Sequence, residues 1–406
     1  MLIFIFYYII SPLIFIFIWL TKSLNPKIQS ILSQDINLQT NLNNCNLSKK
    51  KRILIHAASA GEYEQIKPLI EKVDKKKFFV IISCMSPTIF DKIKENNLSD
   101  FTCYHGIDTP WHAKKFLNII KPNIYITTRH DIWPIHLYIA KKMKVKTLII
   151  NANLYESSER LNWFWINFTK YIFKLFNSII VPTKSIQKIF EDKLGINDTL
   201  VIPDTRFEQI IQRKSKSKLN HKLENLINMK NIIFGSISDE DLKILNDETI
   251  KSLKDNNFNW IIVVPHEINL SLIKKIEKIF PHSIKYSNLK NIDKNFGCLI
   301  VDKVGILPEL YKFTKIAYVG GGFGKGVHST LEPLIYNNIV CYGTNIDLLS
   351  EAKEMSELSI GNIISNSSDL KNILKNSNNN IDVIKNYLDK KDNSSIKIYE
   401  HINEII

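Results

Sequence analysis

One carboxylate, Glu62, follows a short apolar run and a run of small residues in Arg52–Ile70, RILIHAASAGEYEQIKPLI. The apolar run has the composition of a buried strand, and the small residues Ala57–Gly61 would let a substrate approach the backbone. Glu62 is then predicted to lie in the first turn of a helix. There it would serve either as an acid that complements the helix dipole or as a general base. This stretch alone leaves both interpretations open.

A glycine cluster lies near residue 320. Five of the 13 glycines fall within seven residues: Gly320, Gly321, Gly322, Gly324 and Gly326. They follow a predicted strand, Ile316–Val319, and precede a helix predicted to begin near Ser329. Backbone N–H groups of such a loop, with a helix N-terminus, can bind a phosphate, although a tight structural turn is the alternative. Glu332, early in that helix, would accept hydrogen bonds from a ribose or act as a capping acid.

Charged residues follow other predicted strands. VIPDTRFEQ holds Asp204 and Arg206, and Arg206 is one of only five arginines in a lysine-rich chain. The planar fork of arginine suits phosphate or carboxylate, but a surface ion pair would also account for it. TTRHDIWP holds Arg129 and Asp131, and VVPHEI holds His266.

The acidic run Asp239–Asp241 resembles a metal-binding Asp-x-Asp. Because Ser238 precedes it, an N-cap followed by acids that match the helix dipole is the favoured interpretation. The five cysteines, Cys45, Cys84, Cys103, Cys298 and Cys341, have no metal-ligand spacing, and the odd count indicates reduced thiols in a cytoplasmic compartment. No metal site is therefore predicted.

The elements that position these residues alternate between short β-branched runs and longer amphipathic stretches, which predicts an α/β protein with two Rossmann-like, doubly wound parallel sheets. We expect an N-terminal domain at residues 22–211, a lysine-rich linker at 212–230, and a C-terminal domain at 231–406 closed by a C-terminal helix. Ligands of such sheets bind beyond the carboxyl ends of the strands, so the cleft between two such domains is the expected site.

The first 21 residues are predicted to be a transmembrane anchor. MLIFIFYYIISPLIFIFIWL carries no charge, and twenty helical residues span about 30 Å, the thickness of a bilayer core. A cleaved signal peptide needs a basic start and a small-residue cleavage site, and the sequence shows neither. Lys22, Lys27 and SKKKR at Ser48–Arg52 follow the span and place the remaining chain on the cytoplasmic side. Between them, Thr21–Leu47 is expected to be a polar tether with some helix.

The net charge of +14 suggests an anionic partner, but lysine, asparagine and isoleucine are abundant throughout the chain, so a compositional bias accounts for part of it. Nucleic acid is not expected to be a partner, because no basic helix interleaved with aromatic residues is present.

Taken in order, the motifs resemble the family of 3-deoxy-D-manno-octulosonic acid (Kdo) transferases of lipopolysaccharide synthesis. The matching stretches are the anchor, HAASAGE, DTP at 108, RHDIWP at 129, NANLYESS at 151, DTRF at 204, GSISDED at 235, PHE at 265 and GGGFGKGVHSTLEP at 320. The resemblance implies a GT-B fold, CMP-Kdo as donor and a lipid A precursor at the inner membrane as acceptor. It implies no cofactor or metal.

The resemblance also implies roles for individual residues. Glu62 corresponds to the proton acceptor and Arg206 to the residue that stabilises the transition state. Many members read ETELWP where this chain reads RHDIWP, so Arg129 replaces a glutamate and Asp131 keeps an acid at the second position; both are candidate catalytic residues. The implied CMP site comprises Pro265, His266, Val304, Gly305, Ile306, Gly321, Gly322, Ser329, Thr330, Leu331 and Glu332. Two departures fall here: Pro265-His266-Glu267 replaces Pro-Arg-His, and His328-Ser329 replaces His-Asn.

The sequence therefore predicts an inverting glycosyltransferase in which Glu62 takes the proton of the acceptor hydroxyl. Two alternatives stay open: another membrane-anchored GT-B enzyme that uses a UDP-sugar, and a non-catalytic membrane-anchored adaptor.

Overall fold

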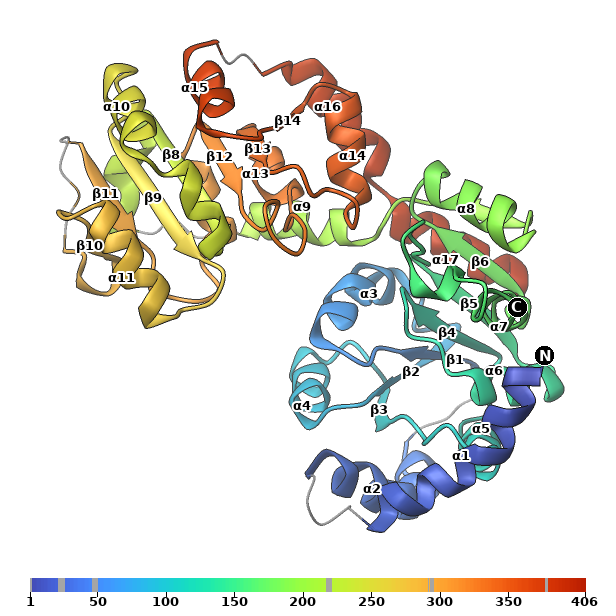
Figure 1. The fold of residues 1–406 in the computed structure, drawn as a ribbon. Helices are drawn as coiled ribbons and strands as arrows, with labels where there is room; N and C mark the ends of the chain where they lie inside the picture. The colour runs from blue at the N-terminus through green and yellow to red at the C-terminus, as the bar shows by residue number, and fades with distance from the viewer. Residues whose placement is uncertain are drawn as a thin grey trace. The chain divides into compact units, whose positions relative to one another are not determined.

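The computed structural model describes residues 2–20, 26–45, 50–216, 221–290, 292, 296–376 and 379–406. The chain forms two compact units, Met1–Gln209 with Lys391–Ile406 (unit 1) and Ile210–Lys390 (unit 2). Each unit contains one seven-stranded parallel sheet with helices packed against it (Figure 1). The α/β prediction with two Rossmann-like sheets is confirmed. The cleft between them stays a prediction.

The sheet of unit 1 has the strand order β3-β2-β1-β4-β5-β6-β7. Its central strands are buried along most of their length, as in β2, where all seven residues are buried, because helices cover both faces of a parallel sheet. The chain order reverses between β1 and β4. The strands are β1 (Lys51–His56), β2 (Phe78–Cys84), β3 (Phe101–Tyr104), β4 (Ile124–Thr128), β5 (Lys146–Ile150), β6 (Ser178–Val181) and β7 (Thr199–Val201).

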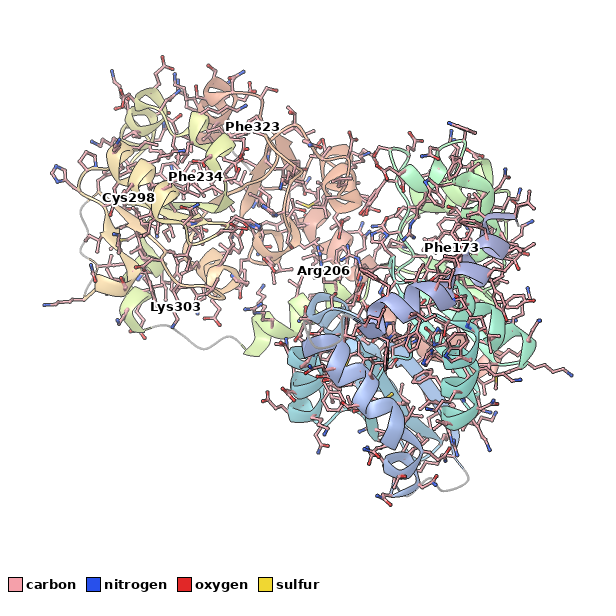
Figure 2. The ribbon with its side chains drawn as sticks, turned by 60° about the horizontal axis from the view of Figure 1, so that its bottom comes forward. Phe173, Arg206, Phe234, Cys298, Lys303 and Phe323 are labelled. Carbon is pink, nitrogen blue, oxygen red and sulfur yellow. The ribbon has the colours of Figure 1, made fainter. Side chains whose placement is uncertain are left out.

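The helices of unit 1 pack on the two faces of this sheet and bury one apolar cluster on each. Phe173 of α7 is fully buried in one of them (Figure 2). Proline at the first helical position begins α4, α5 and α6, where its missing N–H is not needed. The helices are α3 (Ala60–Lys72), α4 (Pro87–Asn96), α5 (Pro110–Ile120), α6 (Pro134–Lys142), η2 (Glu159–Leu161), α7 (Ile166–Phe173) and α8 (Lys184–Leu194).

The C-terminal helix α17 (Ser394–Ile405) belongs to unit 1, not to the C-terminal domain as predicted. Ile398 and Ile402 are fully buried in the apolar cluster under β1 and α3, and the backbone N–H of Ser395 donates to Glu208 at 2.6 Å. The apolar stripe of this helix was visible in the sequence, but a stripe does not say which sheet it covers. The prediction that residues up to 406 close the second domain was wrong for this helix.

The two N-terminal helices are α1 (Leu2–Leu20) and α2 (Pro26–Asn43). In the described residues, α1 is the one helix whose length and composition would let it cross a membrane, with a mean hydropathy of 2.5. The stretch expected to be a polar tether with some helix contains α2, which also buries Ile31, Leu38 and Leu42. Leu38 and Leu42 join the apolar cluster that contains α5 residues.

The sheet of unit 2 has the order β10-β11-β9-β8-β12-β13-β14, so its chain order reverses between β8 and β12. Apolar clusters cover its two faces; Phe234 and Cys298 lie in one of them (Figure 2). The strands are β8 (Asn231–Ile237), β9 (Trp260–Pro265), β10 (Ile284–Lys285), β11 (Gly297–Ile300), β12 (Ile316–Val319), β13 (Ile339–Tyr342) and β14 (Gly361–Ile363). The helices are η4 (Asp239–Ile244), α10 (Asp247–Asp255), α11 (Leu270–Ile279), α12 (Leu307–Leu310), η6 (Tyr311–Phe313), α13 (Leu331–Ile335), α14 (Ser350–Glu357), α15 (Ser367–Asn376) and α16 (Ile381–Lys391).

The predicted linker is largely helical where the structure describes it. The boundary between the units falls inside α9 (Arg206–Lys216). The 3-10 helix η3 (His221–Asn228) then packs onto unit 2 through Leu223 and Leu226, which are both fully buried. The lysine-rich composition suggested a linker because it masked these two apolar anchors. Residues 217–220 of the predicted linker lie outside the described residues.

Candidate functional site

The switch point of the unit 1 sheet lies between β1 and β4. Connections from adjacent strands leave in opposite directions there, which opens a crevice at the carboxyl ends where ligands of such sheets bind. The loop after β1 leads to Glu62, and the loop after β4 holds Asp131. The structure therefore brings two predicted carboxylates to the same edge of one sheet.

Glu62 is a capping residue in a partly buried position. The backbone N–H of Ser59 donates to Glu62 Oε2 at 2.9 Å, and the N–H of Glu62 donates to Ser59 Oγ at 3.3 Å, which completes a capping box at the start of α3. The structural interpretation of this acid is thus confirmed. Burial and the negative charge of Asp131 raise the pKa of Glu62 above its ordinary value, although Ser59 and His56 oppose the shift. A carboxyl with a raised pKa is a better proton acceptor.

Two ring nitrogens lie beside Asp131, and one of them, the indole nitrogen of Trp133, makes a hydrogen bond to it. Oδ2 lies 2.9 Å from Nε2 of His56, the fully buried last residue of β1, and Oδ1 accepts a hydrogen bond of 2.9 Å from the indole of Trp133. The other nitrogen of His56 lies 2.9 Å from Ser83 Oγ. Sequence reasoning missed His56. Its signal was a histidine directly after the apolar residues Ile53–Ile55, at the end of β1.

A chain of buried polar rings extends from His56 to helix α1. The ring of His105 lies 4.2 Å from that of His56 and 4.2 Å from that of His136, between centroids. His136 Nδ1 is 2.8 Å from Asp108 Oδ1, and the hydroxyl of Tyr7 in α1 donates to Asp108 Oδ2 at 2.9 Å. Burial lowers the pKa of His105 well below its ordinary value, so this central ring is neutral. The candidate site and α1 are thus parts of one packed polar network.

Arg206 is the first residue of α9 and is half-buried (Figure 2). Its backbone N–H donates to Asp204 Oδ1 at 2.8 Å, and the other oxygen of Asp204 accepts a hydrogen bond of 2.6 Å from Gln65. Gln65 lies one turn after Glu62 on α3. One helix therefore carries the candidate base and fixes the backbone of the candidate cation. Sequence reasoning also missed Gln65, which gave no signal beyond its place three residues after Glu62.

Arg129 adopts a left-handed backbone conformation, with φ 57°, directly after β4. A non-glycine residue in this region costs conformational energy, and such residues are concentrated at functional sites. Its N–H donates to Ile150 O at 3.0 Å, which fixes the turn. The positive charge of Arg129 also acts on its neighbour His130. Burial, followed by the charges of Arg129 and Arg160, lowers the pKa of His130 to about 4.

In unit 2 the glycine cluster follows β12, beside the switch point between β8 and β12. Gly321 has φ 88° and Gly326 has φ 133°. A Cβ at Gly320 would lie 2.3 Å from the backbone oxygen of Ser236, so only glycine allows the loop to pack against the end of β8. Close packing of the backbone, as in the tight structural turn given as the alternative, therefore explains part of the glycine cluster.

Asp241 pins this loop. Its Oδ2 accepts from the N–H of Gly321 at 2.9 Å and from the N–H of Ser238 at 2.8 Å, and its Oδ1 accepts from the hydroxyl of Tyr318 at 2.6 Å. Asp241 is 1% exposed. The predicted N-cap at Ser238 is confirmed by a capping box, although the helix is a 3-10 helix. Sequence reasoning missed the contact of Asp241 with the glycine loop.

Two stacked histidines flank the same edge. The rings of His266 and His328 lie 4.1 Å apart and are nearly parallel, at 10°, and His266 Nδ1 is 2.8 Å from Ser236 Oγ. Burial lowers the pKa of His328, and the neighbouring ring of His266 lowers it further. Ser236 has φ 56°. His266 follows β9, Ser236 lies in β8 and His328 follows the glycine loop, so three connections converge here.

The helix predicted to begin near Ser329 begins at Leu331 and has five residues. A helix this short has little macrodipole, so its N-terminus would add little to phosphate binding, which stays a prediction. Ser329 Oγ and Thr330 Oγ1 are instead buried hydroxyl oxygens without a hydrogen-bond partner among the described residues. Unsatisfied buried hydroxyls are uncommon. Glu332 lies half-buried in the first turn of α13.

The remaining predicted donor-site residues lie on the β9 and β11 side of the sheet. Pro265 is the buried last residue of β9. After β11, Val304 is 77% exposed, and Gly305 has φ 86° and accepts a hydrogen bond of 3.0 Å from Arg213 through its carbonyl. Ile306 precedes α12. The described contacts of Gly305 are to Arg213 and not to the glycine loop.

Comparison with known proteins agrees with the resemblance given by the motifs. A family model described as "3-Deoxy-D-manno-octulosonic-acid transferase (kdotransferase)" matches residues 33–209, which include Glu62, Asp131 and Arg206. The 3-deoxy-D-manno-octulosonic acid transferase of Aquifex aeolicus is 27% identical over 78% of this chain and 81% of its own length. The 3-deoxy-D-manno-octulosonic acid transferase of Haemophilus influenzae is 23% identical over 82% of this chain and 80% of its own length. The chain is thus similar to Kdo transferases across most of its length.

Kdo transferases are glycosyltransferases, and the fold of this chain agrees with that class. The structure of UDP-GlcNAc 2-epimerase from Neisseria meningitidis superposes with a TM-score of 0.61 over 87% of this chain and all of that one, at 13% identity. The structure of MurG from Acinetobacter baumannii superposes with a TM-score of 0.51 over 87% of this chain and 99% of that one, at 9% identity. These likenesses confirm the GT-B type of fold for this chain and carry no information on its substrates.

Proposed function

We propose that this enzyme is an inverting glycosyltransferase that moves Kdo from CMP-Kdo to a lipid A precursor in lipopolysaccharide synthesis. The observation that carries the proposal is the arrangement at the switch point of unit 1. There a half-buried Glu62 with a raised pKa lies near Asp131, which is itself held by His56 and Trp133. Similarity to the Kdo transferases suggests the donor and acceptor classes.

In the proposed reaction, an acceptor hydroxyl loses its proton to Glu62 as its oxygen bonds to the anomeric carbon of Kdo. The bond from that carbon to the phosphate oxygen of CMP breaks, and CMP leaves with the electron pair. A positioned base typically contributes about 10²–10⁴-fold. Arg206 would stabilise negative charge that develops on the leaving phosphate. Its backbone is held by Asp204, which Gln65 of α3 anchors.

In unit 2 the proposed donor site combines the glycine loop with the hydroxyls of Ser329 and Thr330. Their oxygens lack partners within the described protein, and a nucleotide would supply them. Asp241 holds Gly321, and so the loop, in place. Fixed donors of this kind suit a monophosphate leaving group, so we expect the reaction to need neither a metal nor a cofactor.

We further propose that α1 anchors the enzyme in the inner membrane with the two units on the cytoplasmic side. The helix has the required length and hydropathy, and 11% of its most apolar window is buried. Phe4 and Tyr7 of α1 contact unit 1, so we expect the helix to enter the lipid from the cytoplasmic face through its exposed apolar residues, such as Phe6 and Leu13. Lys22 and Lys27, which follow it, would face the anionic headgroups of that leaflet. Such an anchor would confine the enzyme to the surface where a glycolipid acceptor lies.

The test is Kdo transfer from CMP-Kdo, generated in situ, to a tetra-acylated lipid A precursor, with wild type beside Glu62→Gln. Glu71→Gln is the matched control, because Glu71 is an exposed glutamate on the same helix. We expect product from wild type and control, and a loss of about a hundredfold or more in folded Glu62→Gln. Full activity in Glu62→Gln would overturn the role of Glu62.

The two alternatives give different results. A UDP-sugar enzyme would be stabilised against heat by UDP and not by CMP, and would form no product from CMP-Kdo. A non-catalytic adaptor would form no product from any of these donors and would be indifferent to Glu62→Gln.

A further inference from the structure

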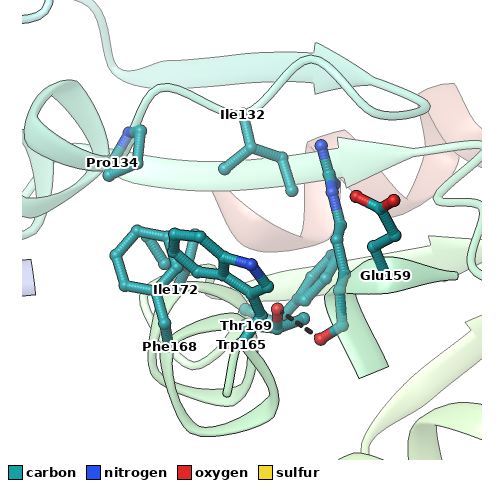
Figure 3. Close-up of a pocket in the computed structure, with 9 residues that line it drawn as sticks. Ile132, Pro134, Glu159, Trp165, Phe168, Thr169 and Ile172 are labelled. Atoms are coloured by element: carbon teal, nitrogen blue, oxygen red, sulfur yellow. Dashed lines mark hydrogen bonds between the residues drawn. The ribbon is translucent and has the colours of Figure 1, made fainter. Parts of the chain in front are cut away.

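Unit 1 contains an apolar cavity of about 330 Å³ (Figure 3). Ile132 and Pro134 line one side, and Trp165, Phe168 and Ile172 line the other. Arg160 and Glu159 also line it. Phe168 is half-buried and Trp165 is 40% exposed, so the cavity opens to the surface and is not a closed packing defect.

One wall of this cavity continues the candidate catalytic loop. Ile132 and Pro134 directly follow Asp131, and a guanidinium nitrogen of Arg160 donates to the carbonyl of His130 at 3.1 Å. A ligand in the cavity would therefore extend toward the edge of the sheet where Asp131 and Glu62 lie.

The opposite wall adjoins the apolar N-terminal helix. Helix α7 lines the cavity with Phe168 and Ile172. From the same helix, Tyr171 packs on Phe4 of α1, with ring centroids 5.0 Å apart. The cavity and the docking site of α1 therefore share one helix.

An exposed aromatic run precedes α7. Trp163 is 87% exposed and Phe164 is 50% exposed, and neither is explained by packing within the described chain. Tryptophan side chains at such positions are typical of the membrane–water interface. Together with α1, this run indicates that the cavity opens where the protein meets the lipid.

We propose that this cavity binds one acyl chain of the glycolipid acceptor and that Arg160 faces an anionic group of the same molecule. The apolar walls match a hydrocarbon chain, and a half-buried guanidinium suits a phosphate or carboxylate. Seating the chain here would direct the sugar portion of the acceptor toward Asp131 and Glu62. This inference rests on the proposed function, because it names the part of the acceptor that the protein holds.

The experiment compares two acceptors, a tetra-acylated lipid A precursor and its fully deacylated counterpart. Ile132→Trp fills the cavity, and Phe168→Gln makes its wall polar. Ile381→Trp is the matched control, because Ile381 is 59% exposed at the start of α16 in unit 2. Thermal unfolding verifies that each variant is folded.

We expect both cavity variants to raise KM for the acylated acceptor by about tenfold, the effect of losing about two buried methylene groups. For the deacylated acceptor, the KM of Phe168→Gln should equal that of wild type, and Ile381→Trp should change neither KM nor kcat for either acceptor. Equal KM values for wild type and both folded variants with the acylated acceptor would overturn the inference.

A second measurement does not depend on turnover. A phospholipid with a diazirine on its acyl chain, mixed with the protein in detergent micelles and irradiated, should label the peptide that contains Trp165–Phe173, and Ile132→Trp should abolish this labelling. Labelling confined to α1 would contradict the acyl site. If wild type transfers Kdo to neither acceptor, the proposed function fails, and the labelling result still decides whether the cavity binds an acyl chain.

Discussion

Nε2 of His56 lies 2.9 Å from Oδ2 of Asp131, and the two side chains are 0% and 12% exposed. The pair joins the ends of β1 and β4, the strands on either side of the switch point in unit 1. It holds a carboxylate close enough to Glu62 to raise the pKa of that residue. Two acids that act on one another across a switch point suggest different roles, one as the proton acceptor and the other as the group that tunes it.

Asp131→Asn should lower the pKa of Glu62, because it removes a nearby negative charge that favours the protonated form. Since the proposed base acts when ionised, the acidic limb of the pH profile of kcat/KM should move to lower pH. The profile of wild type is measured beside Asp131→Asn, with Glu71→Gln as the control that leaves the limb in place. An unshifted limb in Asp131→Asn would show that Glu62 does not set it.

Glu62→Gln should not destabilise the protein at neutral pH. With its folded-state pKa raised, Glu62 favours folding below the unfolded-state pKa, and this contribution is lost as the pH rises through the folded-state pKa. Glutamine keeps an oxygen that can accept from Ser59 N–H, as capping boxes allow. The midpoint of thermal unfolding at pH 7 should equal or exceed that of wild type. A clear fall in this midpoint would mean that the ionised cap outweighs the cost of its burial.

Gln65→Leu should act at a distance on Arg206. The change leaves one oxygen of the half-buried Asp204 without its 2.6 Å hydrogen bond, and the loss of such a bond costs about 1 kcal/mol. The freed aspartate would hold the N-terminus of α9 less firmly, so kcat should fall about tenfold or more while KM for the acceptor changes little, a fall that corresponds to about 1.4 kcal/mol. Kinetics and thermal unfolding are measured together. Loss of stability with kcat unchanged would make Gln65 purely structural.

Asp241→Asn should loosen the glycine loop of unit 2. One acceptor oxygen is replaced by a donor that faces N–H groups, among them that of Gly321 at 2.9 Å. The expected destabilisation is about 1–3 kcal/mol, with a smaller increase in melting temperature on addition of CMP. Asp239→Asn is the control, because Asp239 is exposed in the same short helix. An unchanged response to CMP would separate this loop from nucleotide binding.

The fold was largely predictable because strands buried on both faces of a parallel sheet form continuous β-branched runs. Two strands give little signal in the sequence: β3 (Phe101–Tyr104) is short and includes polar residues, and β10 has two residues. Candidate residues after strands were predictable because ligands bind at carboxyl ends. Partners such as His56 and Asp241 were not, because each makes contacts with residues distant in sequence, and one sequence does not specify such contacts.

Helix α1 should stabilise unit 1 as well as anchor it. Tyr7 donates to Asp108 at 2.9 Å, and Phe4 is 4% exposed between the rings of Tyr138 and Tyr171. Tyr7→Phe removes one hydrogen bond without changing the packing and should cost about 0.5–1.5 kcal/mol, whereas Phe4→Ala removes a buried ring and should cost about 3–5 kcal/mol. Thermal unfolding in one detergent gives both values, with Phe6→Ala as the control because Phe6 is 66% exposed on the same helix. Equal melting temperatures for Phe4→Ala and Phe6→Ala would mean that α1 is a tether that does not dock on the enzyme.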